Sequence, residues 1–182
     1  MTESTPTEEP ARTRKGRNFA VAALVALAVG AIDQTSKALA IGSLSNGDRI
    51  PLLGDLLGLQ LAFNPGTVMS LGSGSTWILT LVSSVATVAL LVAAARAKSL
   101  GWAVAIGFVW GGAAGNLIDR LFADPAPGRG HVTDFLAYGD LFIGNLADVA
   151  LGVGAVIVVA LLVRRRPNGT ITGEPDVKAG SD

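Results

Sequence analysis

Apolar residues are gathered into long runs along this chain rather than dispersed among polar ones. Such runs have about the length, near 20 residues, that an α-helix needs to cross a hydrocarbon core of roughly 30 Å. The membrane spans that they predict lie at about residues 19–41, 77–95, 100–118 and 141–163. We therefore expect an all-α integral membrane protein built as a bundle of four transmembrane helices.

Basic residues between the spans set the expected orientation. They lie before the first span, between the second and third, and after the fourth: Arg12, Arg14, Lys15, Arg17, Arg96, Lys98 and residues 164–166. By the positive-inside rule both termini are cytoplasmic, and the connections 42–76 and 119–140 lie on the extracytoplasmic side. The polar residues 1–18 and 164–182 are predicted to be disordered cytoplasmic tails that flank a membrane domain of residues 19–163.

The first span also fits a different interpretation. Basic residues followed by a short apolar core are typical of a cleaved secretory signal peptide. The long, acidic stretch before this span and the three spans that follow it favour a retained membrane helix.

Composition narrows the possible chemistry. The 182 residues are 50% hydrophobic and 15% charged, with no cysteine, and the mean hydropathy is +0.52. These values exclude a soluble globular enzyme, a disulfide-built secreted domain, a thiolate metal site and a cysteine nucleophile. The formal net charge is zero, so no nucleic-acid partner is expected.

Partial alternation of apolar residues appears in the first outer connection. Residues 49–54 and 57–64 show it, and this pattern predicts short strands at the membrane surface.

Placing an ionisable residue inside a membrane span costs free energy, so such a residue indicates a structural or functional role. Asp33 and Lys37 are four residues apart, on one face of the first predicted helix, where an ion pair would ease the burial of both charges. The pair can serve a site or can pin this helix to its neighbours.

The third span ends in a glycine-rich and then polar stretch. Asn116 and Asp119 share a helix face, and Arg120 follows them. These residues can form a helix terminus tied to the outer loops or a polar shell around a site. The glycines repeat every four residues and predict close helix packing: Gly107, Gly111 and Gly115.

Two further aspartates flank the start of the fourth span. Asp134 precedes it, and Asp148 is expected about 10 Å below its outer end. Two carboxylates that approach each other in a low dielectric share a proton, which is the arrangement of an aspartic peptidase. Spacing alone does not show that these two meet, and a lone membrane aspartate also serves in helix contacts or proton relays.

Five short motifs follow one another along the membrane region of the sequence. They are Asp33-Gln-Thr-Ser-Lys37, Asn64-Pro-Gly66, Gly112-Ala-Ala-Gly-Asn-Leu-Ile-Asp-Arg120, Val132-Thr-Asp-Phe135 and Asn145-Leu-Ala-Asp148. This ordered set resembles that of the bacterial lipoprotein signal peptidases, also called signal peptidase II.

The resemblance implies a fold and a set of site residues. The fold would be a four-helix membrane bundle with a small extracytoplasmic β-sheet and a mobile outer lid, which agrees with the polar loop 122–131. The catalytic pair would be Asp134 and Asp148. The positions that would shape the site and hold the substrate are Asp33, Lys37, Asn64, Gly66, Asn116, Asp119, Arg120 and Asn145.

The implied activity is that of a membrane aspartic endopeptidase of the bacterial cell membrane. It would remove signal peptides from diacylglyceryl-modified prolipoproteins, cleaving before the lipidated cysteine of the substrate. The active site would face the extracytoplasmic side, with membrane lipid as the other partner and no metal or organic cofactor. We expect a monomer.

Two departures from the family pattern concern the pocket wall. Residues 67–69, Thr-Val-Met, stand where small residues and an aromatic are usual, and Gly144 stands where phenylalanine is usual. Both leave the two carboxylates in place, so they bear on substrate or inhibitor fit.

Two other functions are alternatives to a peptidase. In a small proton-coupled transporter or channel, a relay would use Asp33, Lys37, Asp119 and Asp148; the apolar inner halves of the spans disfavour it. A packing or assembly protein built on the glycine face would leave Asp134 and Asp148 unexplained.

Overall fold

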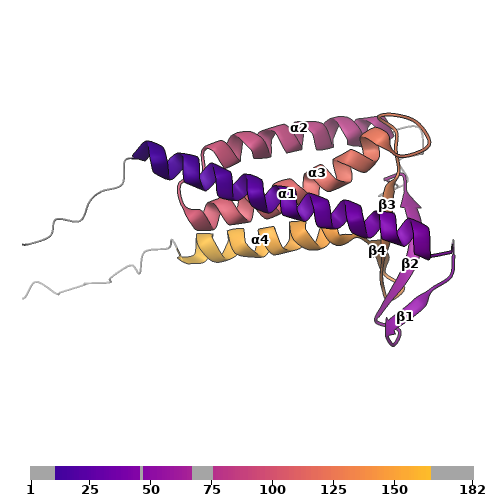
Figure 1. The fold of residues 1–182 in the computed structure, drawn as a ribbon. Helices are drawn as coiled ribbons and strands as arrows, with labels where there is room; N and C mark the ends of the chain where they lie inside the picture. The colour runs from indigo at the N-terminus through magenta and orange to yellow at the C-terminus, as the bar shows by residue number, and fades with distance from the viewer. Residues whose placement is uncertain (1–10, 46, 67–75, 165–182) are drawn as a thin grey trace, which may run out of the picture.

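Four long helices form the body of the molecule (Figure 1). The computed structural model describes residues 11–45, 47–66 and 76–164. Its helices are α1 (Ala11–Ser43), α2 (Thr76–Ala95), α3 (Leu100–Phe122) and α4 (Leu146–Arg164). All four are long and apolar enough to cross a membrane, and they run side by side. The predicted helix bundle is confirmed.

A small antiparallel sheet lies across one end of the bundle (Figure 1). Its strands are β1 (Ile50–Leu53), β2 (Leu57–Asn64), β3 (Val132–Tyr138) and β4 (Phe142–Gly144), hydrogen-bonded in that order. The predicted strands within residues 49–64 are confirmed, and their partners β3 and β4 are additions from the structure. The pairing of β2 with β3 brings two segments distant in sequence to the end of the bundle.

The first helix begins earlier than the sequence predicts. Residues 11–18, expected in a disordered tail, belong to α1. Asn18 is only 2% exposed, and its Nδ2 donates to the carbonyl oxygen of Ala97 at 3.1 Å. Arginine and lysine are good helix formers, and extending an existing helix costs little, so the helix continues beyond the apolar run.

The fourth helix begins later than expected. Phe142–Gly144 form β4, and α4 starts at Leu146. Asp148 therefore lies in the first turn of α4, not about 10 Å inside the helix. The apolar residues from 141 onward conceal this boundary because a short apolar strand and a buried helix start look alike in hydropathy.

Glycines of α3 let the neighbouring helices approach closely. A Cβ placed on Gly107 would lie 2.8 Å from the carbonyl oxygen of Ala22, and one on Gly111 would lie 2.7 Å from that of Ala26. This geometry supports the packing interpretation of the glycine repeat. It also brings the second half of α1 against the end of α3, where the polar residues of both helices meet.

Candidate active site

The start of α4 is closed by two residues that cap each other. The backbone N–H of Asp148 donates to Oδ1 of Asn145 at 3.0 Å, and the backbone N–H of Asn145 donates to Oδ2 of Asp148 at 3.2 Å. This reciprocal pattern is a capping box, with Asn145 as the N-cap. It fixes the position of the Asp148 carboxylate relative to the helix backbone.

The same asparagine reaches the second aspartate. Nδ2 of Asn145 donates to Oδ1 of Asp134 at 2.6 Å, and Nδ2 of Asn64 donates to Oδ2 of Asp134 at 3.1 Å. Asp134 is 3% exposed and comes from β3, while Asn64 ends β2. The structure thus brings Asp134 and Asp148 into one cluster, joined through Asn145.

The surroundings of Asp134 favour its protonated form. Burial raises the pKa of Asp134 to about 6, and the nearby negative charge of Asp148 acts in the same direction. The amide donors of Asn64 and Asn145 and the charge of Lys37 lower the pKa and offset part of this effect. A carboxyl group with such a pKa can hold or release a proton close to neutral pH.

Asp148 is itself exposed, and Asn116 connects it to a group of buried charges. Nδ2 of Asn116 donates to Oδ1 of Asp148 at 3.1 Å, and Oδ1 of Asn116 accepts from Nζ of Lys37 at 3.0 Å. Lys37 also pairs with Oδ2 of Asp33 and with Oδ2 of Asp119, each at 2.8 Å. One buried ammonium therefore serves two carboxylates and orients the amide that holds Asp148.

Asp33 links this group to the helix that carries Asp148. Its Oδ1 accepts from the backbone N–H of Ala147, in the first turn of α4, at 2.9 Å. Negative charge is stabilised at a helix N-terminus, where backbone N–H groups lack helical partners. Gly115 makes room for this carboxylate, because a Cβ there would lie 2.5 Å from Oδ2 of Asp33. Gly115, the last glycine of the repeat, thus provides the space that the Asp33 carboxylate occupies in the polar cluster.

Asp119 connects α3 to β3 at Thr133, the residue before Asp134. Its Oδ2 accepts from the backbone N–H of Thr133 at 3.0 Å, and its Oδ1 accepts from Nε2 of Gln34 at 3.0 Å. Gln34 also donates to the carbonyl oxygen of Gly115 at 3.0 Å. Gln34 was not among the predicted site residues, although its position beside Asp33 was a signal that could have found it.

Asn64, Gly66 and Arg120 form the edge of the cluster beside Asp134. Oδ1 of Asn64 accepts from the backbone N–H of Gly66 at 2.8 Å, and Gly66 has a φ of 89°, which favours glycine. A Cβ on Gly66 would lie 3.3 Å from Nη2 of Arg120. Among the described residues, the buried Nη1 of Arg120 has no hydrogen-bond partner. All ten predicted site residues therefore lie in one connected region.

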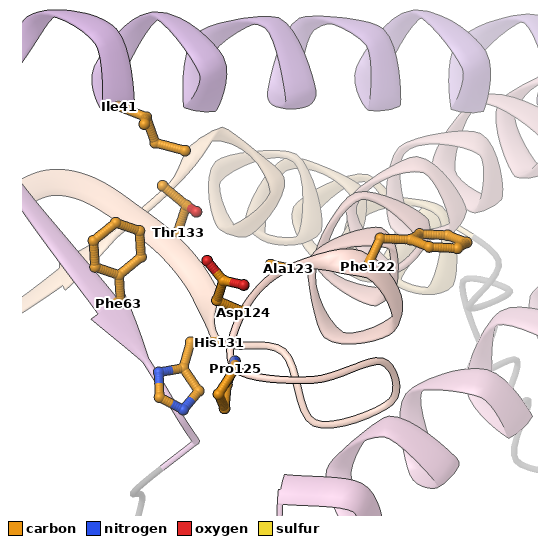
Figure 2. Close-up of a pocket in the computed structure, with 8 residues that line it drawn as sticks. All are labelled: Ile41, Phe63, Phe122, Ala123, Asp124, Pro125, His131 and Thr133. Carbon is orange, nitrogen blue, oxygen red and sulfur yellow. The ribbon is translucent and has the colours of Figure 1, made fainter.

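A separate cavity of about 570 Å³ lies on the other face of the sheet (Figure 2). Phe63 and Thr133 are paired across β2 and β3 and both line it, so the next residue, Asp134, points to the opposite face. His131 and Asp124 come from the loop after α3 and also line this cavity. The loop 122–131, associated above with a lid, is tied back by backbone hydrogen bonds from Gly128 to Leu121 and from Gly130 to Arg120.

The two departures from the family pattern differ in what the structure shows of them. Residues 67–69 lie outside the described residues. At Gly144, a Cβ would lie 2.9 Å from Oδ2 of Asp148 and 3.4 Å from the ring of Phe142. Gly144 therefore gives the Asp148 carboxylate space that a larger residue would contest. Within the described ranges, no group of three or more His, Asp or Glu side chains could hold a metal ion.

Fold and site together define a multi-pass membrane protein with two carboxylates clustered at one end of its helix bundle. The model of the peptidase A8 family, described as signal peptidase (SPase) II, matches residues 25–164. The chain belongs to this family, so it is a protease.

The names of similar proteins agree with this family assignment. A lipoprotein signal peptidase of Bifidobacterium longum (strain NCC 2705) is 45% identical over 148 residues, which cover 81% of each chain. Those of Leifsonia xyli subsp. xyli and Mycobacterium avium are 43% and 39% identical, over 85% and 82% of this chain and 73% and 82% of theirs. A bacterial membrane enzyme solved by the in meso method at 1.9 Å resolution superimposes with a TM-score of 0.66 at 25% identity, covering 80% of this chain and 94% of that one.

Proposed function

We propose that this protein is an aspartic endopeptidase that removes signal peptides from diacylglyceryl-modified prolipoproteins, cleaving before the lipidated cysteine of the substrate. The observation that carries the proposal is the pair Asp134 and Asp148, both hydrogen-bonded to Asn145. The curated names of the relatives, lipoprotein signal peptidase, support the substrate class.

In the proposed chemistry, the two carboxyl groups hold one proton between them at the start and at the end of each cycle. Asp134 starts protonated, in keeping with its raised pKa, and Asp148 starts as the carboxylate. Asp148 takes a proton from water while the water oxygen adds to the scissile carbonyl carbon and Asp134 gives its proton to the carbonyl oxygen. Asp148 then protonates the leaving amine as the C–N bond breaks. Asp134 takes back a proton from the intermediate, which restores the starting state.

The remaining residues of the cluster position these two carboxylates or meet the substrate. Asn116 and Asn145 hold the two carboxylates, while Lys37 and Asp33 fix Asn116 and the start of α4. Arg120 is the donor best suited to a substrate carbonyl group. Its buried Nη1 has no partner in the described part of the chain, and it interacts electrostatically with Asp134. Burying a donor without a partner is costly, so a substrate acceptor would relieve this cost.

The charge distribution supports an orientation in the membrane. All described acidic residues belong to the sheet, to its connections or to the helix halves that lead to it. The helix ends away from the sheet (Figure 1) carry Arg14 and Lys15 in α1, Arg96 and Lys98 between α2 and α3, and Arg164 in α4. With the positive end in the cytoplasm, both termini are cytoplasmic and the carboxylate pair faces the extracytoplasmic side. The substrate's acyl chains then stay in lipid while the peptide reaches the site. The membrane domain, residues 19–163, acts as a monomer in this proposal.

The transporter alternative is not supported, because the family and the curated relatives are peptidases. In the described residues, moreover, no acidic side chain lies in the halves of the helices away from the sheet, so a relay across the bilayer lacks members there.

A cleavage assay on purified protein in lipid vesicles tests the proposed function. It compares a diacylglyceryl-modified prolipoprotein with the unmodified precursor, and mass spectrometry identifies the new N-terminus. Cleavage of the modified precursor alone, with the lipidated cysteine first in the product, is the expected result. Equal cleavage of both precursors would overturn the lipid-dependent substrate class, and cleavage of neither by folded protein would overturn the activity.

A further inference from the structure

A basic hollow lies at the end of the bundle opposite to the sheet, where α2 turns into α3. It has a volume of about 240 Å³ and is lined by Ala93, Arg96, Ala97, Lys98, Trp102 and Ile106. This hollow is independent of the carboxylate cluster and of the activity proposed above.

The mouth of the hollow carries positive charge. Arg96 and Lys98 are both exposed, and within residues 11–45, 47–66 and 76–164 neither forms an ion pair. The N-terminus of α3 begins beside them, capped by the Ser99 side chain, which accepts from the backbone N–H of Trp102 at 3.5 Å. A helix N-terminus adds a partial positive charge to the two side chains. An anion at this mouth would meet no described acidic group.

The deeper part of the hollow is apolar. Ala93 lies in the last turn of α2, and Ile106 lies about 9 Å along α3 from its first residue. Trp102 also lines the hollow and lies in the first turn of α3, near the helix end, where an indole ring suits the membrane interface. Along α3 the lining of the hollow therefore changes from the cationic turn to the apolar Ile106.

The turn that carries the two cations is anchored rather than loose. Asn18 of α1 is buried, and its Nδ2 donates to the carbonyl oxygen of Ala97 between Arg96 and Lys98. Backbone hydrogen bonds from Arg96 to Ala93 and from Ala97 to Ala94 close the turn. The backbone positions of Arg96 and Lys98 are thus set by the fold before any ligand arrives, which lowers the backbone part of the ordering cost on binding.

We propose that this hollow binds one anionic phospholipid, with the phosphate at Arg96 and Lys98 and an acyl chain along Ala93 and Ile106. The charge at the mouth complements a phosphate, and the apolar floor complements a hydrocarbon chain, so a lipid with a net negative headgroup satisfies both parts. Basic residues at a membrane surface attract anionic lipids.

Native mass spectrometry of the full-length protein in detergent tests the proposal. Phosphatidylglycerol and phosphatidylcholine are titrated separately, and soluble glycerol phosphate is added as a competitor in a third arm. The test variant is Arg96→Gln with Lys98→Gln, and the matched control is Arg14→Gln with Lys15→Gln. The control removes the same charge from exposed residues at the same end of the molecule. Equal thermal unfolding of both double variants and the wild type checks that the fold is intact.

The expected result is one tightly retained phosphatidylglycerol in the wild type and in the control, with affinity about tenfold or more weaker in the Arg96→Gln, Lys98→Gln variant. Phosphatidylcholine binds weakly to all three proteins. Equal retention by the test variant and the control, equal binding of phosphatidylcholine, or displacement by millimolar glycerol phosphate would each overturn the proposal.

Discussion

Asn145 and Asp148 cap each other at the N-terminus of α4, each backbone N–H donating to the other's side chain. Since Asn145 also donates to Asp134 at 2.6 Å, one side chain fixes both the start of a membrane helix and the relative position of two carboxylates. The candidate site is therefore built into the beginning of α4, and changes to Asn145 separate its structural role from its role at the site.

Asn145→Ser is expected to keep the helix cap and to lose the bond to Asp134. Serine is a good N-cap residue but has no amide to donate. We expect kcat for prolipoprotein cleavage to fall about 100-fold or more, while the free energy of unfolding changes by less than about 1 kcal/mol. Asn145→Ala also loses the cap and is expected to cost about 1 kcal/mol in addition. A serine variant with wild-type kcat would show that the contact to Asp134 is dispensable.

The stability of the protein is expected to depend on pH through Asp134. Burial raises the pKa of this carboxyl from 3.8 to about 6, so the folded state binds the proton more tightly than the unfolded state. Its stabilising contribution is fully present below about pH 3.8 and is lost as the pH rises through about 6. Asp134→Asn removes this dependence. The difference in Tm, variant minus wild type, should therefore increase between pH 4 and pH 7.

Other titrating groups cancel in that difference because both proteins contain them. A difference in Tm that stays flat, or that decreases with rising pH, would contradict the raised pKa of Asp134.

Lys37→Met is expected to be strongly destabilising. The change leaves Asp33 and Asp119 buried together without their shared cation, and breaking a buried pair in this way costs about 3–5 kcal/mol. Asp33→Asn is expected to cost less, because Lys37 keeps Asp119 and Asn116. Arg49→Met is the matched control, since Arg49 pairs at 3.1 Å with the fully exposed Asp140. Equal unfolding curves for the Lys37 and Arg49 variants would contradict this account.

Gly115→Ala is expected to reduce activity through Asp33. The new Cβ would lie 2.5 Å from Oδ2 of Asp33, so the carboxylate must leave the position where it accepts from Ala147. Gly152→Ala, in α4, is the control, because a Cβ there meets nothing within 4 Å. We expect kcat/KM to fall about tenfold or more for the first variant and to stay near wild type for the second. Similar losses in both variants would point to helix packing in general.

The helices could be predicted because their apolar runs match the thickness of a bilayer. Their ends could not, because hydropathy does not register the features that stop or start a helix. The Asn-x-x-Asp spacing of Asn145 and Asp148 was a visible sign of an N-cap, and it would have moved the start of α4 past Phe142–Gly144. β3 was hidden because it pairs with β2 across a long sequence separation.

The sequence motifs predict which residues belong to the candidate site, but they do not predict which of these residues contact each other. Asp33 and Lys37 pair across one turn of α1, as their spacing predicts, but that spacing does not indicate that Lys37 also contacts Asp119 and Asn116. Gln34 is not predicted as a site residue, because burying a neutral amide costs less than burying a charge and therefore indicates a function less strongly. Such contacts depend on how α1 and α3 pack, which a pattern along one helix does not record.

The central claim is that Asp134 and Asp148 carry out the cleavage together. The most direct measurement is the single-turnover rate on a diacylglyceryl-modified prolipoprotein for the wild type, Asp134→Asn, Asp148→Asn and the exposed-site control Asp140→Asn. Asparagine keeps the shape and polarity of aspartate but cannot take or give the proton. We expect both site variants to lose about 1,000-fold or more while remaining folded, with the control unchanged. Cleavage at a rate near that of the wild type by either site variant would contradict the assignment.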